Sequence, residues 1–460
     1  MDKKHFNHFK GIVGEENIYE DKAHLIAYSY DATREHFEPD AVIFPRHEED
    51  ISNILKYCNE NRIIIVPRGA GSGFTGGAIP SEGGIVLAFE RHMTKILEID
   101  MKNMVAVVQP GVINMDLQKA VEEVGLFYPP DPASQDYSTI GGNVNENAGG
   151  MRAAKYGITK DYVMAIRAVL PNGDIIKAGK RTIKDVAGYN IAGILIASEG
   201  TLAVTTEITL KLLSKPKLTK TAMGIFPTVT EAMEAVYKTM AGGVTPVAME
   251  FLDNLTIRAV EQTFNKGLPV EAGAILITDV DGNLENDLDF QLDLIERIFK
   301  ENGCSEFKRA KDKEEAADLW FARRNASQSL SIYGSKKLNE DVTVPRAVLH
   351  ELLEAFYKIA EKYNVNIPCF GHTGDGNVHT NVMVDGSDPE QVKIAYQAIE
   401  EVFQATVDLG RTLSGEHGIR IAKAPYMSMA FTEEEMNLFN TIKHAFDPNN
   451  ILNPHKMGLK

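Results

Sequence analysis

The sequence predicts an α+β protein with more than one domain, and three observations support this. The chain has 460 residues, more than a single hydrophobic core usually holds together. Up to about residue 213, helical and strand patterns alternate along the chain. After the short, polar and basic stretch 213–220 the pattern restarts, and it then predicts an antiparallel sheet with helices. We therefore place a first domain boundary between residues 217 and 218.

The elements of the first part follow from apolar spacing and turn residues. Ile51, Ile54, Leu55 and Cys58 fall on one face of a helix, and residues 63–66 then predict a buried strand. The other expected elements are a helix over 117–124 ended by Gly125, a hairpin of strands 165–170 and 174–178 around Pro171-Asn172-Gly173, and a strand over 203–213.

In the second part, a strand over 222–226 leads into a helix that begins with a capping box, Thr228 with Glu231. The further expected elements are strands near 247–252 and 274–278, helices over 283–302, 313–327 and 346–363, a hairpin, a helix with a second capping box at Ser387 and Glu390, and a C-terminal helix.

Composition limits the possible functions. The formal net charge is −16, from 48 Lys and Arg against 64 Asp and Glu, which argues against a nucleic-acid-binding surface. An anionic substrate must then be bound by a few local cations.

Cys58, Cys304 and Cys369 lie far apart, which predicts reduced thiols, and they are too few for an iron–sulfur cluster with four cysteine ligands. Without a signal peptide or a run of about 18 apolar residues, the protein is expected in the cytoplasm with no transmembrane segment, and peripheral membrane association through a partner is left open.

A glycine-rich loop over 67–77 follows the predicted strand and contains the spacing G-x-G-x-x-G. A Rossmann fold would need a helix directly afterwards, but Pro80 and two glycines at 83–84 prevent a regular helix. The better interpretation is a loop whose backbone N–H groups, with the Ser72 and Thr75 hydroxyls, bind a pyrophosphate. A plain surface loop is the alternative.

A second glycine-rich stretch covers residues 129–134 and 138–157, with four Gly and three Asn within 141–150. Such a stretch is typical of backbone that lies against a flat ligand, because an ordinary loop is rarely so long and so rich in glycine. A third segment, 198–210, places Gly200 just before a strand.

These three segments, in this order and spacing, resemble the FAD-binding domain of the vanillyl-alcohol oxidase / p-cresol methylhydroxylase flavoproteins. Over nearly its full length the chain resembles their D-lactate dehydrogenase and glycolate oxidase flavoprotein-subunit group. The resemblance implies a two-subdomain FAD-binding domain over 1–217, a cap domain with an antiparallel sheet over 218–412, and a C-terminal segment over 413–460 that returns to the FAD domain. Many relatives attach FAD through a His at the position of Ser72, so we expect non-covalent FAD here.

The resemblance also implies which residues contact the cofactor. They are Pro67, Arg68, Gly69, Ala70, Gly71, Ser72, Gly73, Thr75, Gly76, Pro130, Asp131, Ser134, Gly141, Gly142, Asn143, Ala148, Gly149, Gly157, Gly200 and Asn453.

A possible metal site follows from the residues themselves. Asp375-Gly376 is a strong two-residue hairpin signal, and a turn there pairs His372 directly with His379 on one face. Two imidazoles in such a pair can chelate one divalent ion, although two histidines on strands can also be ordinary core or surface residues.

A carboxylate for this metal lies between two glycines in Ser414-Gly415-Glu416-His417-Gly418, where an incidental loop charge is the alternative. In the resembling family these two segments form a metal-bearing active site. Carried over, His372, His379 and Glu416 bind zinc, manganese or iron, Asn381 lies close by, and His417 acts as the catalytic base. Two His and one carboxylate leave open positions, as in a catalytic site.

The substrate carboxylate needs a cation. Relatives use the Arg three residues after a Trp, which corresponds to Arg323 after Trp320, and a guanidinium pairs with both carboxylate oxygens. Some relatives that act on larger dicarboxylates have a Lys where this chain has Asn339, although Lys336 and Lys337 are near this position. This difference favours lactate or glycolate over 2-hydroxyglutarate.

The expected function is therefore oxidation of a small D-2-hydroxy acid to the 2-keto acid by metal-assisted hydride transfer to FAD. Without an iron–sulfur or haem motif, electrons are expected to pass to a separate redox protein or quinone. The alternatives are a D-2-hydroxyglutarate-type dehydrogenase, an NAD(P)-dependent Rossmann dehydrogenase, a metallohydrolase, and a non-catalytic flavin subunit of a redox complex. Whether the chain forms a homodimer or joins a redox complex is left open.

Overall fold

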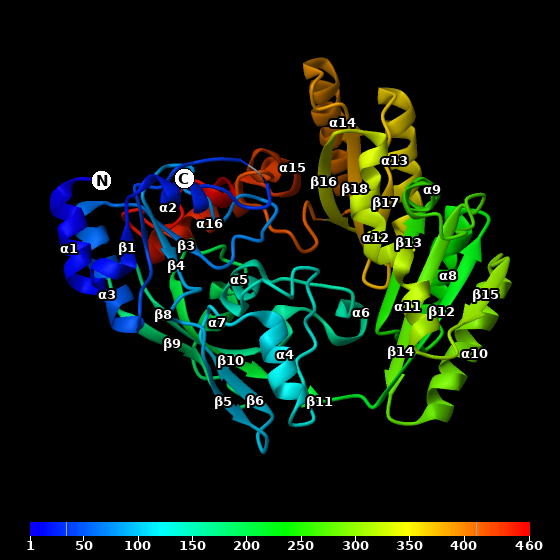
Figure 1. Cartoon of the computed structure of the whole chain (residues 1–460), viewed down its shortest axis with the longest axis horizontal. Coiled ribbons are helices and arrows are strands. Elements are labelled where there is room, and N and C mark those ends of the chain that lie inside the picture. Colours follow the sequence, from blue (N-terminus) through cyan, green and yellow to red (C-terminus); the bar gives the residue numbers. More distant parts are fainter. Residues whose placement is uncertain (34, 411) are drawn as a thin grey trace. The chain divides into compact units, whose positions relative to one another are not determined.

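The computed structural model describes residues 1–33, 35–410 and 412–460, which form two compact units (Figure 1). Unit 1 consists of residues 1–149, 158–215 and 416–460, and unit 2 consists of residues 150–157 and 216–415. None of the helices in these described ranges is long and apolar enough to cross a membrane.

A four-stranded sheet in unit 1 carries the first glycine-rich loop. Its strands, in spatial order, are β1 (Ile18–Tyr19), β2 (Ala41–Ile43), β4 (Ile85–Ala88) and β3 (Ile65–Arg68). Strands β2, β4 and β3 are parallel, and α3 (Glu48–Asn61) connects β2 to β3. As predicted, Ile51, Ile54, Leu55 and Cys58 are the buried face of α3. Near the C-terminus, Leu452 forms a parallel bridge with Ile65, so the last part of the chain extends this sheet at β3.

A five-stranded antiparallel sheet forms the second part of unit 1. In spatial order it contains β5 (Ile96–Asp100), β6 (Val105–Val108), β10 (Val204–Lys211), β8 (Val163–Val169) and β9 (Ile175–Gly179). Strands β8 and β9 form the predicted hairpin, with Gly173 in its turn at φ +88°. The remaining elements of unit 1 are β7 (Leu126–Phe127), β11 (Leu213–Ser214), α1 (Lys3–Val13), α2 (Lys22–Ala27), α4 (Asn114–Glu122), α5 (Ile140–Glu146), α7 (Ile191–Leu195), α15 (Met427–Ala430) and α16 (Glu433–Phe446).

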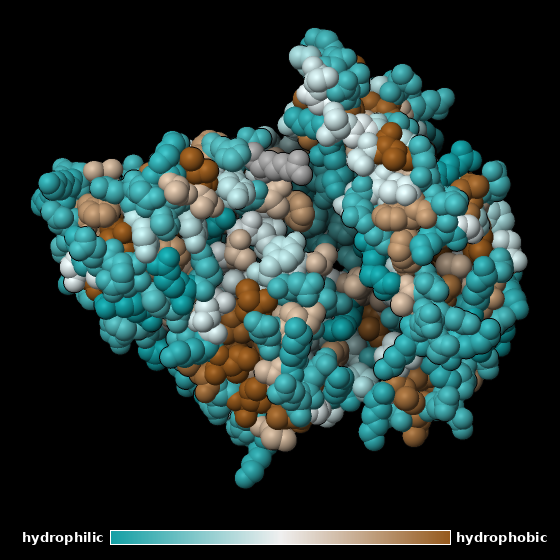
Figure 2. Space-filling model, viewed as in Figure 1, coloured by the Kyte–Doolittle hydropathy of each residue, from teal (hydrophilic) through white to brown (hydrophobic). Residues whose placement is uncertain are grey.

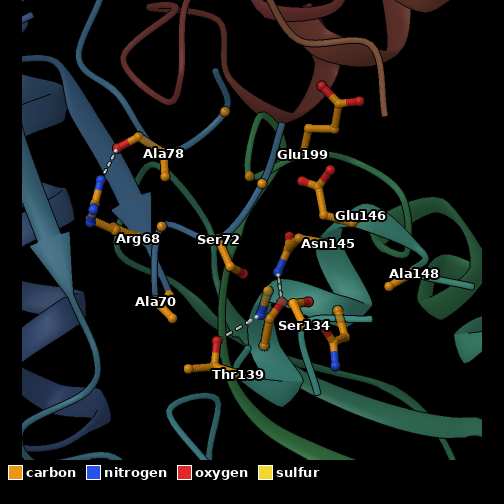
Figure 3. A pocket seen from close by; sticks show the side chains of 18 of the residues that line it. Arg68, Ala70, Ser72, Ala78, Ser134, Thr139, Asn145, Glu146, Ala148 and Glu199 are labelled. Carbon is orange, nitrogen blue, oxygen red and sulfur yellow. Dashed lines mark hydrogen bonds between the residues drawn. The ribbon is translucent and has the colours of Figure 1, made fainter. Parts of the chain in front are cut away.

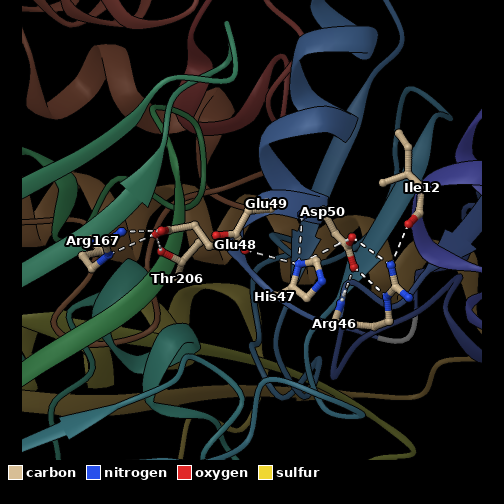
Figure 4. A network of polar contacts seen from close by, with 8 residues as sticks. All are labelled: Ile12, Arg46, His47, Glu48, Glu49, Asp50, Arg167 and Thr206. Atoms are coloured by element: carbon tan, nitrogen blue, oxygen red, sulfur yellow. Dashed lines mark hydrogen bonds and ion pairs between the residues drawn. The ribbon is translucent and has the colours of Figure 1, made fainter.

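The start of α3 joins these two sheets through a polar network (Figure 4). Glu48 Oε1 accepts hydrogen bonds from Arg167 Nε of β8 at 3.2 Å and from Thr206 Oγ1 of β10 at 2.6 Å. Asp50 accepts a hydrogen bond from Arg46 Nε at 2.9 Å. Carboxylates in the first turn also suit the positive end of the helix dipole. The network therefore fixes the helix that precedes the glycine-rich loop.

Unit 2 is built on a seven-stranded antiparallel sheet, as the sequence predicts. In spatial order its strands are β15 (Glu306–Arg309), β12 (Leu218–Phe226), β14 (Ala274–Gly282), β13 (Ala248–Asp253), β17 (Cys369–His372), β18 (Asn377–Val384) and β16 (Lys336–Thr343). The helices of unit 2 are α6 (Ala153–Tyr156), α8 (Val229–Ala241), α9 (Asn254–Phe264), α10 (Glu285–Glu301), α11 (Lys313–Leu319), α12 (Phe321–Ser329), α13 (Leu349–Tyr363) and α14 (Pro389–Asp408). The capping box of Thr228 and Glu231 is present at α8.

Two local expectations for unit 2 are wrong. Asp388, not Ser387, caps α14, because Pro389 occupies the first helical position and Asp388 Oδ1 accepts from the backbone N–H groups of Glu390 and Gln391. The expected single helix over 313–327 consists of α11 and α12, which meet at Trp320.

Figure 2 shows hydrophilic side chains over most of the visible face and apolar side chains gathered near β5 and β6 of unit 1. Leu97, Met101 and Met104 are exposed in this part of the chain. A contiguous apolar patch of this kind often marks an interaction surface.

Candidate active site

A pocket in unit 1 gathers segments that are far apart in the sequence (Figure 3). It is lined by parts of the three glycine-rich segments, at 67–78, 132–149 and 199–205, and by Glu416, His417 and Arg420. The predicted cofactor residues that line it are Pro67, Arg68, Gly69, Ala70, Gly71, Ser72, Gly73, Ser134, Gly141, Gly142, Asn143, Ala148, Gly149 and Gly200. Those that do not line it are Thr75, Gly76, Pro130, Asp131, Gly157 and Asn453.

The glycines of this pocket permit close approach of backbone segments. A Cβ atom at Gly69 would collide with the hydroxyl of Thr139, the N-cap of α5, whose Oγ1 accepts from Gly142 N at 3.2 Å. Gly71 has φ +67°, a conformation that favours glycine. The described backbone over 69–84 contains no helix, so the rejection of a Rossmann interpretation holds. The second stretch contains the short helix α5, which Thr139 and Asn147 cap.

Two guanidinium groups flank the first glycine-rich loop. Arg68 Nη1 donates to the carbonyl oxygens of Tyr30 at 2.8 Å and Ala78 at 3.3 Å, and Figure 3 shows Arg68 beside Ala78. Arg420 is buried, and a Cβ at either Gly73 or Gly77 would collide with its guanidinium. Burial lowers the pKa of Arg420 to about 10, so the group stays positively charged at neutral pH.

The segment that carries Glu416 and His417 is fixed to this pocket. Glu199 accepts hydrogen bonds from the backbone N–H groups of Ile419 at 2.8 Å and Arg420 at 2.9 Å. Burial raises the pKa of Glu199 to about 7, although these two N–H groups act in the opposite direction. Thr75 Oγ1 donates to the carbonyl oxygen of His417 at 3.0 Å. The predicted metal ligand Glu416 and the predicted base His417 therefore line the same pocket as the glycine-rich loops.

In unit 2, His372 and His379 lie on one face of the sheet, but not in the predicted register. Strands β17 and β18 pair Phe370 with His379, and residues 373–376 connect them, so Asp375-Gly376 is not a two-residue turn. The direct pairing of His372 with His379 is therefore wrong. The two histidines are diagonal neighbours, which share a face and can touch through long side chains. Their Nε2 atoms are 3.4 Å apart, and both side chains are buried.

This distance fits a shared divalent ion. Two imidazole nitrogens about 2.0–2.1 Å from one ion at a tetrahedral angle lie about 3.3 Å apart. The chain around the third predicted ligand is held close to the same strands, because Gly415 N donates to Asp341 Oδ2 at 2.6 Å and Asp341 lies opposite His379. Glu416 is the next residue in the chain.

A buried carboxylate that the sequence analysis missed joins His372 to Arg323. Glu250 Oε1 and His372 Nδ1 are 2.7 Å apart, and Arg323 Nε donates to Glu250 Oε2 at 2.6 Å. Glu250 is fully buried. Burial acts to raise its pKa, but the interactions with His372 and Arg323 outweigh burial and lower it. Asn381 lies on the same sheet and accepts a hydrogen bond from Asn339 Nδ2 at 2.7 Å.

Residues 39–179 match a family model described as an FAD binding domain, and residues 215–457 match the C-terminal domain of FAD linked oxidases. The chain belongs to this FAD-linked oxidase family. The oxidoreductase is 44% identical over 450 residues to the glycolate oxidase subunit GlcD of Bacillus subtilis, covering 98% of this chain and 95% of that protein. It is 34% identical to a D-lactate dehydrogenase of Anaerostipes hadrus, covering 98% and 94% of the two chains.

Among solved structures, p-cresol methylhydroxylase with substrate bound matches with a TM-score of 0.82 at 19% identity, covering 100% of this chain and 98% of that one. The resemblance to this flavoprotein family and the α+β fold class are thus confirmed.

The pocket residues of this FAD-linked oxidoreductase fit the cofactor. Asn143 Nδ2 and Arg420 Nε are buried donors with no hydrogen-bond partner among the described residues, and both residues line the pocket. FAD carries pyrophosphate and carbonyl oxygens that accept such bonds. Glu146 Oε2, a buried acceptor without a partner in the same described ranges, could accept from an N–H or hydroxyl group of FAD.

The sequence analysis missed Glu250, Arg420, Glu199 and Glu146. A signal for Glu250 was present, because it interrupts the otherwise apolar run 247–252. Glu146 and Glu199 lie within the second and third glycine-rich segments but were not singled out there, and Arg420 lies outside them. Only the folded chain brings these three residues into one pocket.

Proposed function

We propose that this FAD-linked oxidoreductase oxidises a short 2-hydroxy acid, D-lactate or glycolate, to the corresponding 2-keto acid. The observation that carries the proposal is the sheet face of unit 2, where a guanidinium and two facing imidazoles lie around one buried carboxylate. The names of the similar proteins, glycolate oxidase subunit and D-lactate dehydrogenase, support the same substrate class.

Arg323 binds the substrate carboxylate in this proposal. Its Nε is used by Glu250, and its two Nη groups have no hydrogen-bond partner within the described part of the chain. A pair of parallel N–H donors matches the two oxygens of a carboxylate. The neutral Asn339 offers no charge for a second carboxylate, which favours a monocarboxylate over a dicarboxylate.

His372, His379 and Glu416 would hold a divalent ion, zinc, manganese or iron. The facing Nε2 atoms of the two histidines support this, and so does the position of Glu416 directly after Gly415. A bound divalent ion would lower the pKa of the substrate hydroxyl.

His417 takes the hydroxyl proton, and Glu199 and Thr75 hold the segment on which His417 lies. FAD, which the glycine-rich pocket would hold non-covalently, would accept the hydride that leaves C2 of the substrate. The hydroxyl oxygen would keep the electrons of its O–H bond to form the carbonyl. Electrons then pass to a separate redox protein or quinone, consistent with the word subunit in the name of a relative.

Anaerobic reduction of the bound flavin tests this proposal. We expect D-lactate or glycolate to bleach the flavin absorbance, L-lactate and D-2-hydroxyglutarate to do so far more slowly, and a chelator to slow the reaction. His417→Asn should retain FAD and reduce the rate by about 10²- to 10⁴-fold, the usual contribution of a general base. A normal rate of bleaching in His417→Asn would show that His417 is not the catalytic base. If no 2-hydroxy acid bleached the flavin of the wild-type protein, the proposed function would be wrong.

A further inference from the structure

We propose that Glu250 is a positioning residue that couples the substrate-binding guanidinium of Arg323 to the metal-binding imidazole of His372. This inference rests on the function proposed above, because it assumes those two roles. It adds a third group, buried beneath both, that sets their geometry together.

The position of Glu250 explains how one side chain reaches both partners. Glu250 lies in β13, and β17 places His372 directly opposite it. Arg323 comes from α12, which packs with β13 and β17 residues such as Leu252 and Phe370 in one core cluster. Each carboxylate oxygen of Glu250 contacts one partner: Oε1 lies 2.7 Å from His372 Nδ1, and Oε2 lies 2.6 Å from Arg323 Nε. The orientation of the carboxylate is therefore fixed from both sides.

The contact with Glu250 determines which nitrogen of His372 can bind a metal. A carboxylate only accepts hydrogen bonds, so Nδ1 of His372 must carry the hydrogen. The lone pair of the neutral ring then lies on Nε2, the atom that faces His379 Nε2. Carboxylates in this position fix the tautomer and ring orientation of metal-binding histidines in general.

The contact with Arg323 fixes the guanidinium in the same way. Glu250 holds Nε, and the guanidinium carbon lies 4.9 Å from the centre of the Phe370 ring. The Nη edge is then directed away from Glu250. Because the two oxygens belong to one rigid carboxylate, a shift of either partner is transmitted to the other, so substrate binding and metal binding should be linked in free energy.

Stability alone is a weak explanation for this arrangement. A fully buried carboxylate that pairs with a guanidinium usually gains little over apolar residues of the same size, because burial removes the hydration of both charges. A role in the site explains why the charge is kept beneath it.

The test is the zinc affinity of the FAD-loaded protein, measured by competition with a chromophoric chelator, for the wild type and Glu250→Gln. The amide has one acceptor oxygen, so it cannot serve both partners. We expect the zinc dissociation constant to rise about 10- to 100-fold. With saturating zinc, KM for D-lactate or glycolate should rise more than kcat falls.

Asp279→Asn is the matched control. Asp279 is a partly buried carboxylate on the neighbouring strand β14, and it accepts hydrogen bonds from Thr221 Oγ1 and Trp320 Nε1 rather than from His372 or Arg323. We expect Asp279→Asn to alter stability but to keep the wild-type zinc affinity. Equal zinc affinity and equal KM in the wild type, Glu250→Gln and Asp279→Asn would overturn the inference.

A second pair of variants decides the matter if Glu250→Gln does not fold. Arg323→Met removes the far partner of Glu250, and Arg324→Met removes the same charge from the same helix without contact to Glu250. We expect only Arg323→Met to weaken zinc binding, by about threefold or more, because the carboxylate loses the contact that orients it. Unchanged affinity in both variants would overturn the coupling. A wild-type protein that binds no zinc, manganese or iron would instead remove the proposed metal site itself.

Discussion

Asp253→Asn should change how the stability of unit 2 depends on pH. Asp253 caps α9 and is fully buried, with Oδ1 accepting from Thr256 N at 2.8 Å and Oδ2 from Cys369 N at 2.9 Å. Burial raises its pKa from 3.8 to about 6, although these N–H groups act to lower it. The same carboxylate therefore holds the start of β17, the strand that carries His372.

The direction in which stability changes with pH follows from the pKa values of Asp253 in the folded and unfolded states. A group whose pKa is raised in the folded state contributes stability that is fully present below its unfolded pKa and is lost as pH rises through its folded pKa. For Asp253, pKa values of about 6 and 3.8 correspond to about 3 kcal/mol, since one pKa unit is worth about 1.4 kcal/mol. Roughly half of this loss should fall between pH 5 and pH 8.

Neighbouring groups should not mask the effect. The pKa values of Tyr333, Tyr357 and Cys369, which all interact with Asp253, are raised by burial and stay above this pH window. An Asn at position 253 also caps a helix but has no charge, so it loses one acceptor at every pH. That constant cost cancels when the two proteins are compared at two pH values.

The assay is urea unfolding followed by the fluorescence of Trp320, the only tryptophan in the chain and part of the core of unit 2. The difference in unfolding free energy between the variant and the wild type should shift in favour of the variant from pH 5 to pH 8. A difference that stays constant across this range would refute the reasoning about Asp253.

Two further predictions concern the functional residues. Arg420→Met should weaken FAD binding to the apoprotein by about 10- to 100-fold, because hydrogen bonds to charged groups contribute about 1.5–3 kcal/mol. Fluorescence titration of the apoprotein with FAD would measure this affinity. An unchanged affinity would contradict a contact between Arg420 and the cofactor. Arg323→Lys should raise KM for the hydroxy acid by about tenfold or more, because an ammonium cannot pair with both carboxylate oxygens. The affinity for FAD, measured without zinc, should stay the same. A KM equal to that of the wild type in steady-state kinetics would show that Arg323 does not bind the carboxylate.

Local patterns predicted most of the fold. The apolar face of α3, the hairpin around Gly173 and the capping box of α8 depend on residues close in sequence, and the structure contains all three. The pairing of β17 with β18 was predicted in the wrong register, because the turn rule for Asp375-Gly376 ignores neighbouring strands. In the structure β13 and β16 also pair with these two strands, and a four-residue connection satisfies all the pairings.

Site residues that belong to a local sequence motif could be predicted. Site residues that come together only in the folded chain could not. The glycines of the first loop, His372, His379 and Arg323 could each be named from the sequence. Glu250 could not be assigned a role, because its partners come from a strand and a helix that are more than 70 residues away in the chain. The role of such a carboxylate can be inferred only when its two hydrogen-bond partners are known.

The parallel bridge between Ile65 and Leu452 has a consequence for synthesis of the protein. Strand β3 is the last strand of its sheet, and the residues that cover its open edge are translated long after β3 itself. Until then, a nascent chain would display unpaired N–H and C=O groups along a strand of mostly apolar residues, a known template for aggregation. Removing residues 451–460 should therefore send more of the product into inclusion bodies, even though the deletion leaves every strand of the sheet itself intact.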